Sequence, residues 1–171
     1  AVDRLAALAR GELATAHPLA SRLAAEVSRP AMLAFATLLH DVGKAIGGKD
    51  HSQRGAVMAR EILERLEFRD EDIVEACLLI HEHLTMYRLA TRRDVDDPAT
   101  IDEMMASVMS ARETLRNLFL LTVVDVSTTS PTSMTSWKAQ MLDELYLAAD
   151  AALSGAGEAP RAEAARGAVV R

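Results

Sequence analysis

The sequence has only one cysteine, Cys77, so no disulfide can form within the chain. Chains without disulfides are typical of a reducing compartment, and we therefore expect a cytoplasmic protein. Long apolar runs are missing too, since none approaches the roughly 18 residues of a membrane-spanning helix. The first residues also lack the pattern of a secretory signal peptide. We expect no contact with a membrane.

Glycine and proline are scarce, with 8 and 5 residues in a chain of 171, and aromatic residues make up only 4%. Alanine and leucine dominate instead, and both favour helices. The composition therefore predicts an all-α fold of about the size of one domain. The predicted helices cover residues 1–11, 17–28, 30–42, 51–67, 70–88, 98–109, 111–127 and 133–153.

Positive charge is in short supply, because 19 Lys and Arg residues stand against 25 Asp and Glu residues and the formal net charge is −6. Nucleic acids and anionic membranes repel a negative chain, so we expect neither as a partner. An anionic substrate would have to be neutralised by a local cation.

The segment before the C-terminus, "SGAGEAPRAEAARG", has the small and polar composition of a linker. We therefore predict one domain over residues 1–153 and a linker toward a downstream domain over residues 154–171. The opening stretch "AVDRLAALAR" already has helical spacing, so we expect the first helix to be truncated at its N-terminus.

What the chain does have is a set of charged side chains where core residues are expected. The apolar run "AMLAFATLL" ends in His40 and Asp41, and Asp125 lies within "LFLLTVVDV". Ordinary explanations exist: Asp41 can cap or pair, and Asp125 can accept hydrogen bonds from hydroxyl groups. However, burying carboxylates is costly, and imidazoles and carboxylates are the ligands of Mg²⁺, Mn²⁺, Fe and Zn²⁺ in catalytic sites. Together, His40, Asp41 and Asp125 predict a metal site.

Two further histidines, His81 and His83, lie in the segment "LLIHEHL". Residues two apart on a helix point about 200° apart, so only one of the two can face the metal. His51 follows the glycine-rich loop "GKAIGGKD" and can reach an ion or a phosphate, or it can be an exposed residue near a helix cap. Lys44, in that loop, can neutralise phosphate or simply be solvated.

Several ordered segments resemble a known family: "HPLASRL", "LLHDVGK", "GGKDHSQRGA", "HLTMYRLATRRDVDDPATI" and "LFLLTVVDVSTTSPTSMTSWKAQMLDELY". They are similar to the HD superfamily of metal-dependent phosphohydrolases, and most similar to the HD domain of the bifunctional PII uridylyltransferase/uridylyl-removing enzymes. The resemblance covers about residues 17–150. It implies an HD-domain helical bundle that removes UMP from a tyrosine of the PII nitrogen-signalling protein, with a nucleotidyltransferase domain upstream and ACT domains downstream.

The resemblance implies that His40, Asp41 and Asp125 are metal ligands, with Asp41 as the central one. The cofactor would be a divalent cation, Mg or Mn in the first place and Fe or Zn as alternatives. The first histidine of the family's pattern has no counterpart here, because His17 aligns with a segment that holds no ligand. We therefore expect that ligand upstream of Ala1, and weak metal binding by this chain.

The same resemblance implies catalytic roles for Asp41, Lys44, His51 and His83. The two histidines would hold a second metal or the substrate phosphate. Lys44, together with Arg92 or Arg93, would bind phosphate oxygens, although the arginine pair can equally be a solvated loop that contacts a neighbouring domain.

Two other functions remain open at this point. One is hydrolysis of a free nucleotide by the same chemistry, which would need no protein partner. The other is a regulatory helical module without catalysis, which the missing first histidine supports and the ligand set in apolar surroundings opposes.

Overall fold

The computed structural model describes residues 1–47, 50–130 and 132–155, and within these residues the chain forms helices and no strand. The predicted all-α fold is confirmed. In chain order the elements are α1 (Val2–Ala9), α2 (Pro18–Ala25), α3 (Pro30–Leu39), the 3₁₀-helix η1 (Val42–Ile46), α4 (His51–Arg65), α5 (Asp70–Glu82), α6 (Thr85–Arg92), α7 (Pro98–Ser107), α8 (Arg112–Thr129) and α9 (Ser136–Leu153). Most of the predicted linker lies outside the described residues.

Local sequence explains where several helices begin. Proline stands at the first position of α2, α3 and α7, where its missing N–H costs nothing. Asp97 caps α7 by accepting a hydrogen bond from the backbone N–H of Ala99 at 2.9 Å, and Thr135 caps α9 in the same way. No described helix is both long and apolar enough to cross a membrane.

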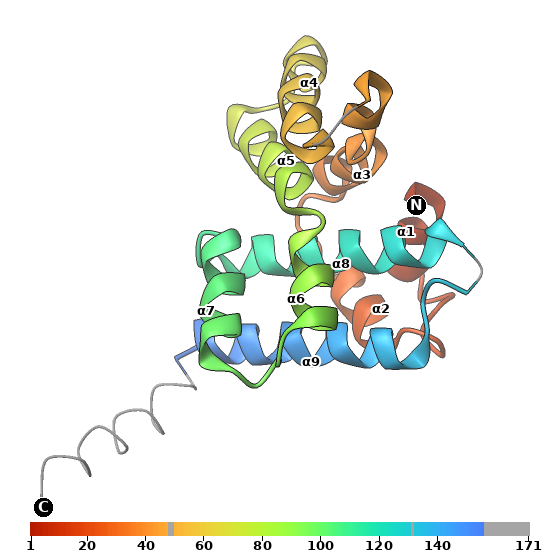
Figure 1. The fold of residues 1–171 in the computed structure, drawn as a ribbon. Helices are drawn as coiled ribbons and strands as arrows, with labels where there is room; N and C mark the ends of the chain where they lie inside the picture. The colour runs from red at the N-terminus through yellow and green to blue at the C-terminus, as the bar shows by residue number, and fades with distance from the viewer. Residues whose placement is uncertain (48–49, 131, 156–171) are drawn as a thin grey trace, which may run out of the picture.

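The prediction of one helix over residues 70–88 is wrong, because α5 ends at Glu82 and α6 begins at Thr85 in a new direction (Figure 1). The imidazole Nδ1 of His83 lies 2.7 Å from the carbonyl oxygen of Ile80, in the last turn of α5. Carbonyls in a last turn have no partner within their helix. The ring of His83 supplies one where the chain turns.

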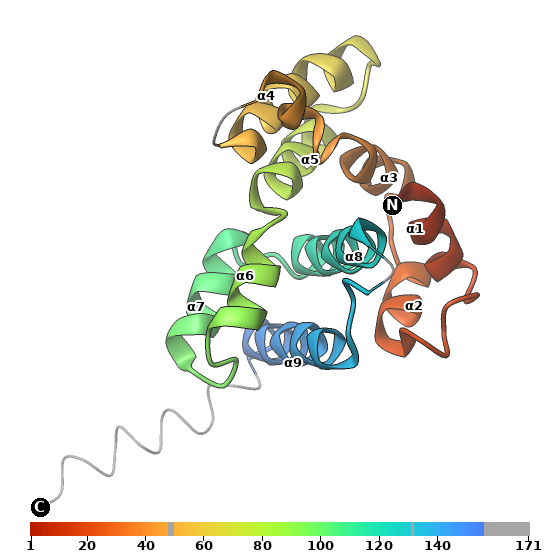
Figure 2. The same ribbon diagram turned by 45° about the vertical axis from the view of Figure 1, so that its right-hand side comes forward.

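The long helix α8 runs through the middle of the molecule, with α1, α2, α3, α5, α6 and α9 packed around it (Figure 2). Its residues are buried on nearly every face, including Leu118, Phe119 and Leu121, which are fully buried. Burying such a side chain stabilises a fold by roughly 1.5–3 kcal/mol. This central helix carries Asp125 out of the core toward the ends of α3 and α5.

The turn after α3 is held against α4 by two glycines. The short helix η1 forms the start of the predicted glycine-rich loop and packs on α4. A Cβ atom on Gly43 would lie 2.7 Å from the backbone nitrogen of Gly55 and would overlap the backbone carbonyl of His51. Glycine at position 43 therefore permits the close approach of η1 to the first turn of α4.

Candidate metal centre

Three side chains from two helices meet where α3 ends beside α8. His40 is the C-cap residue of α3 and Asp41 follows it, while Asp125 lies on α8. The Nε2 atom of His40 is 3.3 Å from Asp125 Oδ1 and 3.4 Å from Asp41 Oδ2. We call His40, Asp41 and Asp125 the Asp125 group. It can hold one metal ion.

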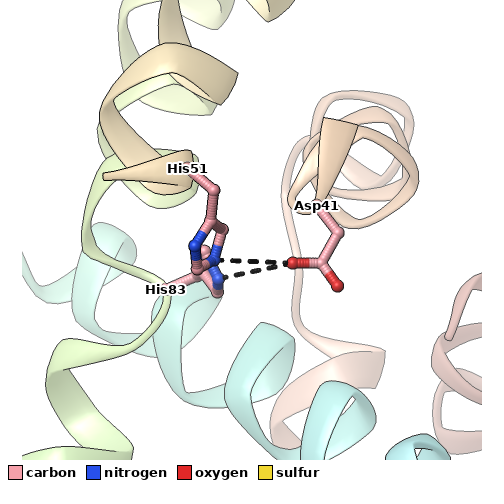
Figure 3. A group of neighbouring side chains, drawn as sticks. All are labelled: Asp41, His51 and His83. Carbon is pink, nitrogen blue, oxygen red and sulfur yellow. Dashed lines mark ion pairs between the residues drawn. The ribbon is translucent and has the colours of Figure 1, made fainter. Parts of the chain in front are cut away.

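The other oxygen of Asp41 faces two further histidines (Figure 3). His51 is the first residue of α4 and His83 is the C-cap residue of α5. Their Nε2 atoms each lie 3.8 Å from Asp41 Oδ1. We call Asp41, His51 and His83 the His83 group. Because the two groups share Asp41, its carboxylate lies between two adjacent sets of ligand atoms.

Backbone carbonyls fix how His40 and His83 present their rings. Nδ1 of His40 lies 2.7 Å from the carbonyl oxygen of Thr37, and Nδ1 of His83 lies 2.7 Å from that of Ile80. A carbonyl only accepts hydrogen bonds, so each Nδ1 carries the proton. In the neutral ring, each Nε2 then has a lone pair directed into the site, as a metal ligand requires.

Among the residues that the structure describes, three buried polar atoms here have no hydrogen-bond partner: His40 Nε2, Asp41 Oδ1 and His51 Nε2. Leaving such atoms unpaired costs free energy, so unpaired buried atoms are expected mainly at sites that bind a ligand. Two ligand atoms at about 2.1 Å from one ion are about 3.0–3.4 Å apart in octahedral or tetrahedral geometry. The contacts within the Asp125 group match this spacing, so its donor atoms fit a divalent cation.

The charges of the two groups are linked. Burial lowers the pKa of His40, but its contacts with Asp125, the Thr37 carbonyl and Asp41 together outweigh burial, so the pKa of His40 is raised. Burial likewise raises the pKa of Asp125, yet contact with His40 brings it below its ordinary value. Burial dominates for His83, whose side chain is 1% exposed and whose pKa is lowered. His83 is therefore neutral near pH 7.

Both groups open into a cavity of about 620 Å³, a volume typical of small-molecule sites. Lys44 lines this cavity, and its Nζ lies 2.7 Å from Asp41 Oδ2. Tyr87 and Lys138 line it as well, and sequence reasoning did not single them out. The sequence pointed to these two residues only indirectly, because both lie inside long segments that carry the family resemblance.

Other candidate residues lie elsewhere. Arg92 and Arg93 are exposed at the far end of α6 and do not line the cavity. His81 points away from the centre, with half of its side chain exposed and its Nδ1 2.8 Å from Glu82. His17 is the N-cap residue of α2 and lines a different cavity. Ala1 borders the main cavity, so the start of α1 lies beside the site.

Comparison with known proteins gives a consistent result. The model of the HD domain family matches residues 14–128, a range that contains every residue of both groups. None of the solved structures gives a significant match to the chain.

Among curated proteins, the chain is similar to bifunctional uridylyltransferase/uridylyl-removing enzymes. It is 40% identical to that of Erythrobacter litoralis over 149 residues, which is 87% of this chain and 16% of the relative. It is 43% identical to that of Thiobacillus denitrificans over 162 residues, 91% of this chain and 19% of the relative. The chain thus spans less than a fifth of the length of these relatives.

Proposed function

Since this chain belongs to the HD domain family, we propose that it hydrolyses a phosphodiester at the cluster centred on Asp41, with a divalent cation as cofactor. The observation that carries the proposal is the position of Asp41, between two sets of candidate ligand atoms. Three of these atoms, His40 Nε2, Asp41 Oδ1 and His51 Nε2, are buried without a hydrogen-bond partner in the described chain. Mg²⁺ or Mn²⁺ is the proposed ion, because two of the three donors in the Asp125 group are carboxylates.

The proposed substrate is the UMP group attached to a tyrosine of PII. The similar relatives are named as uridylyl-removing enzymes, and they are similar over most of this chain. We further propose that the domain acts within a longer protein, beside the nucleotidyltransferase and ACT domains that the resemblance implies.

The Asp125 group would hold the cation. A divalent cation held there would act as a Lewis acid toward a phosphoryl oxygen and would lower the pKa of water toward neutral. Hydrolysis breaks the bond between phosphorus and the tyrosine oxygen. Water would supply a hydroxyl group to phosphorus and a proton to the tyrosine oxygen, so the products are UMP and PII with an unmodified tyrosine hydroxyl.

The other residues act on the substrate. Lys44 is largely exposed beside Asp41 and can bind a phosphate oxygen as the substrate enters. His51 and His83 face Asp41 from the opposite side and would hold a second cation or the phosphate itself. The backbone bond to Nδ1 of His83 keeps that ring oriented throughout.

The test incubates this chain with uridylylated PII and Mn²⁺ or Mg²⁺. Release of UMP is measured from the decrease in the mass of PII. We expect Asp41→Asn and Asp125→Asn to lower the rate at least about 100-fold, because an amide loses the charge that holds the cation. Asp102→Asn, at an exposed position of α7, is the matched control and should retain the full rate.

Other results would overturn parts of the proposal. Hydrolysis of free nucleotides with no action on modified PII would show that the substrate is a free nucleotide and not PII. An absence of hydrolysis with Mg²⁺, Mn²⁺, Fe²⁺ and Zn²⁺ alike, both by this chain and by a longer protein that contains it, would favour a helical module without catalysis. In a longer protein with a nucleotidyltransferase domain, Asp41→Asn should leave uridylyl addition unchanged.

A further inference from the structure

Lys138 is a half-buried cation on the cavity wall, and the chemistry proposed above does not use it. It lies in the first turn of α9, where its backbone N–H donates to Thr135 Oγ1 at 3.2 Å. Its Nζ donates to the carbonyl oxygen of Ser133 at 2.9 Å and lies 5.4 Å from the centre of the Tyr87 ring. The loop before α9 and the ring on α6 thus hold the ammonium group in place.

The charge of Lys138 is not neutralised within the part of the chain that the structure describes. Lys44, on the same cavity, has Asp41 Oδ2 at 2.7 Å, whereas Lys138 has only a neutral carbonyl and an aromatic ring beside it. An ammonium group has three N–H donors, and the carbonyl of Ser133 occupies one. Two donors therefore remain for an acceptor in the cavity.

The position within α9 also matters. Positive charge in the first turn of a helix is unfavourable, because the helix dipole is positive at that end. Lys138 is the third residue of α9, so its own helix opposes its charge. An anion bound in the cavity would be attracted by both the ammonium group and the helix end. Lys138 also lines the cavity into which the Asp125 group opens.

We propose that Lys138 binds the negatively charged phosphate of the nucleotide substrate, from the wall that α6 and α9 form, and that Ser133 and Tyr87 position it. This inference rests on the proposed function and names the side chain that attracts the nucleotide. The phosphate is the assigned target because it carries the charge of the nucleotide, whereas the nucleoside is neutral.

The test is calorimetric titration of UMP, uridine and inorganic phosphate into the chain, with EDTA and again with Mn²⁺. In both conditions we expect Lys138→Met to weaken UMP binding at least about tenfold and to leave any binding of uridine unchanged. Lys138→Arg keeps the charge and should stay within a few fold of the wild type. Tyr87→Leu removes the ring that positions the ammonium group and should weaken UMP binding about threefold.

Arg65→Met, at an exposed cation of α4, is the control for a general change of charge, and it should bind UMP like the wild type. Thermal unfolding should show every variant folded, since Lys138 makes no buried ion pair in the described chain. With uridylylated PII as substrate, Lys138→Met should raise KM more than it lowers kcat.

The possible results separate the two proposals. If the wild type binds UMP and releases it from PII, and Lys138→Met does both equally well, this inference is overturned and the proposed function stands. If neither the wild-type chain nor a longer protein that contains it does either, the proposed function falls and the inference falls with it. A loss of uridine binding equal to the loss of UMP binding would also overturn the assignment to phosphate.

Discussion

The imidazole rings of His40 and His83 lie with their centroids 5.4 Å apart, although the two residues end different helices. Each ring donates from Nδ1 to a backbone carbonyl three residues earlier. Main-chain carbonyls at helix ends hold both rings, so the orientation of each Nε2 does not depend on another side chain. The backbone therefore orients both imidazoles of the candidate metal centre.

The first prediction compares the two neighbouring histidines after α5. His83→Ala should weaken Mn²⁺ binding at least about tenfold, because it removes a buried Nε2 from the His83 group. His81→Ala should bind Mn²⁺ like the wild type, since its exposed ring contacts only Glu82. Calorimetric titration measures both. A large defect in His81→Ala with normal binding by His83→Ala would show that the opposite face holds the ion.

The second prediction concerns the contact between η1 and α4. Gly43→Ala should separate Asp41 from His51 and weaken Mn²⁺ binding at least about tenfold, because the new methyl group overlaps backbone atoms that have no way to rotate aside. The free energy of unfolding should fall by about 1–3 kcal/mol in urea titrations.

Gly55→Ala is the matched control in the same contact. Its added Cβ would lie 3.3 Å from a side-chain methyl of Ile80 and 3.4 Å from the backbone nitrogen of Gly43, so shifts of a few tenths of an ångström relieve it. Metal binding should change less than in Gly43→Ala. Equal effects of the two substitutions would mean that the approach at Gly43 does not set the site.

Much of this arrangement follows from sequence pattern. Periodic apolar residues and prolines at first helical positions gave most helix bounds to within a few residues, and carboxylates inside apolar runs marked Asp41 and Asp125. Residue spacing also predicted that only one of His81 and His83 could face the centre. These features are visible because they depend on neighbours along the chain.

The rest depends on contacts between distant segments. No glycine or proline marks the break between α5 and α6 in the sequence. In the structure, the break coincides with the hydrogen bond from His83 to a carbonyl of α5. Lys138 is likewise an ordinary polar residue of α9 until the fold places Tyr87 beside it. Arg92 and Arg93 looked suitable for phosphate, but the length of α6 carries them away from the cavity.

The third prediction concerns a buried ion network that connects α3, α5 and α8. Arg29, just before α3, lies 2.8 Å from Asp72 Oδ1 and also pairs with Glu75 on α5. Glu75 in turn accepts a hydrogen bond from the Asn117 side chain of α8 at 2.8 Å. Arg29→Met should lower the free energy of unfolding by about 3–5 kcal/mol, because it leaves two buried carboxylates without their shared cation.

Arg69→Met is the control for that substitution. Arg69 also bonds to Asp72, at 3.0 Å, but its side chain is 63% exposed against 22% for Arg29. Its removal should cost much less stability than removal of Arg29, because solvent screens an exposed pair. Urea unfolding at pH 7 compares the two variants. Similar losses would indicate that burial of the pair does not decide its contribution.

The fourth prediction is a pH dependence of stability that arises from Asp72. Burial would raise the pKa of Asp72, but the hydrogen bonds from Arg69 and Arg29 outweigh burial, and the pKa lies below its ordinary value of 3.8. Two other carboxylates also pair with Arg29, those of Glu75 on α5 and of Glu113 on α8. Below pH 3.8 the unfolded chain therefore binds a proton at Asp72 that the folded chain does not yet bind.

It follows that the stabilisation from ionised Asp72 is complete above pH 3.8 and is lost as the pH falls below that value. Asp72→Asn should lower the free energy of unfolding by about 2 kcal/mol at pH 7, since it removes charge-assisted hydrogen bonds. The difference from the wild type should shrink as the pH falls from about 4 to 2, where Asp72 becomes neutral in the wild type as well. Urea titrations of both proteins across this range measure it, with Asp102→Asn as an exposed control. Because every other carboxyl group is shared by the two proteins, a difference that stays constant down to pH 2 would show that Asp72 is not stabilised in its ionised form.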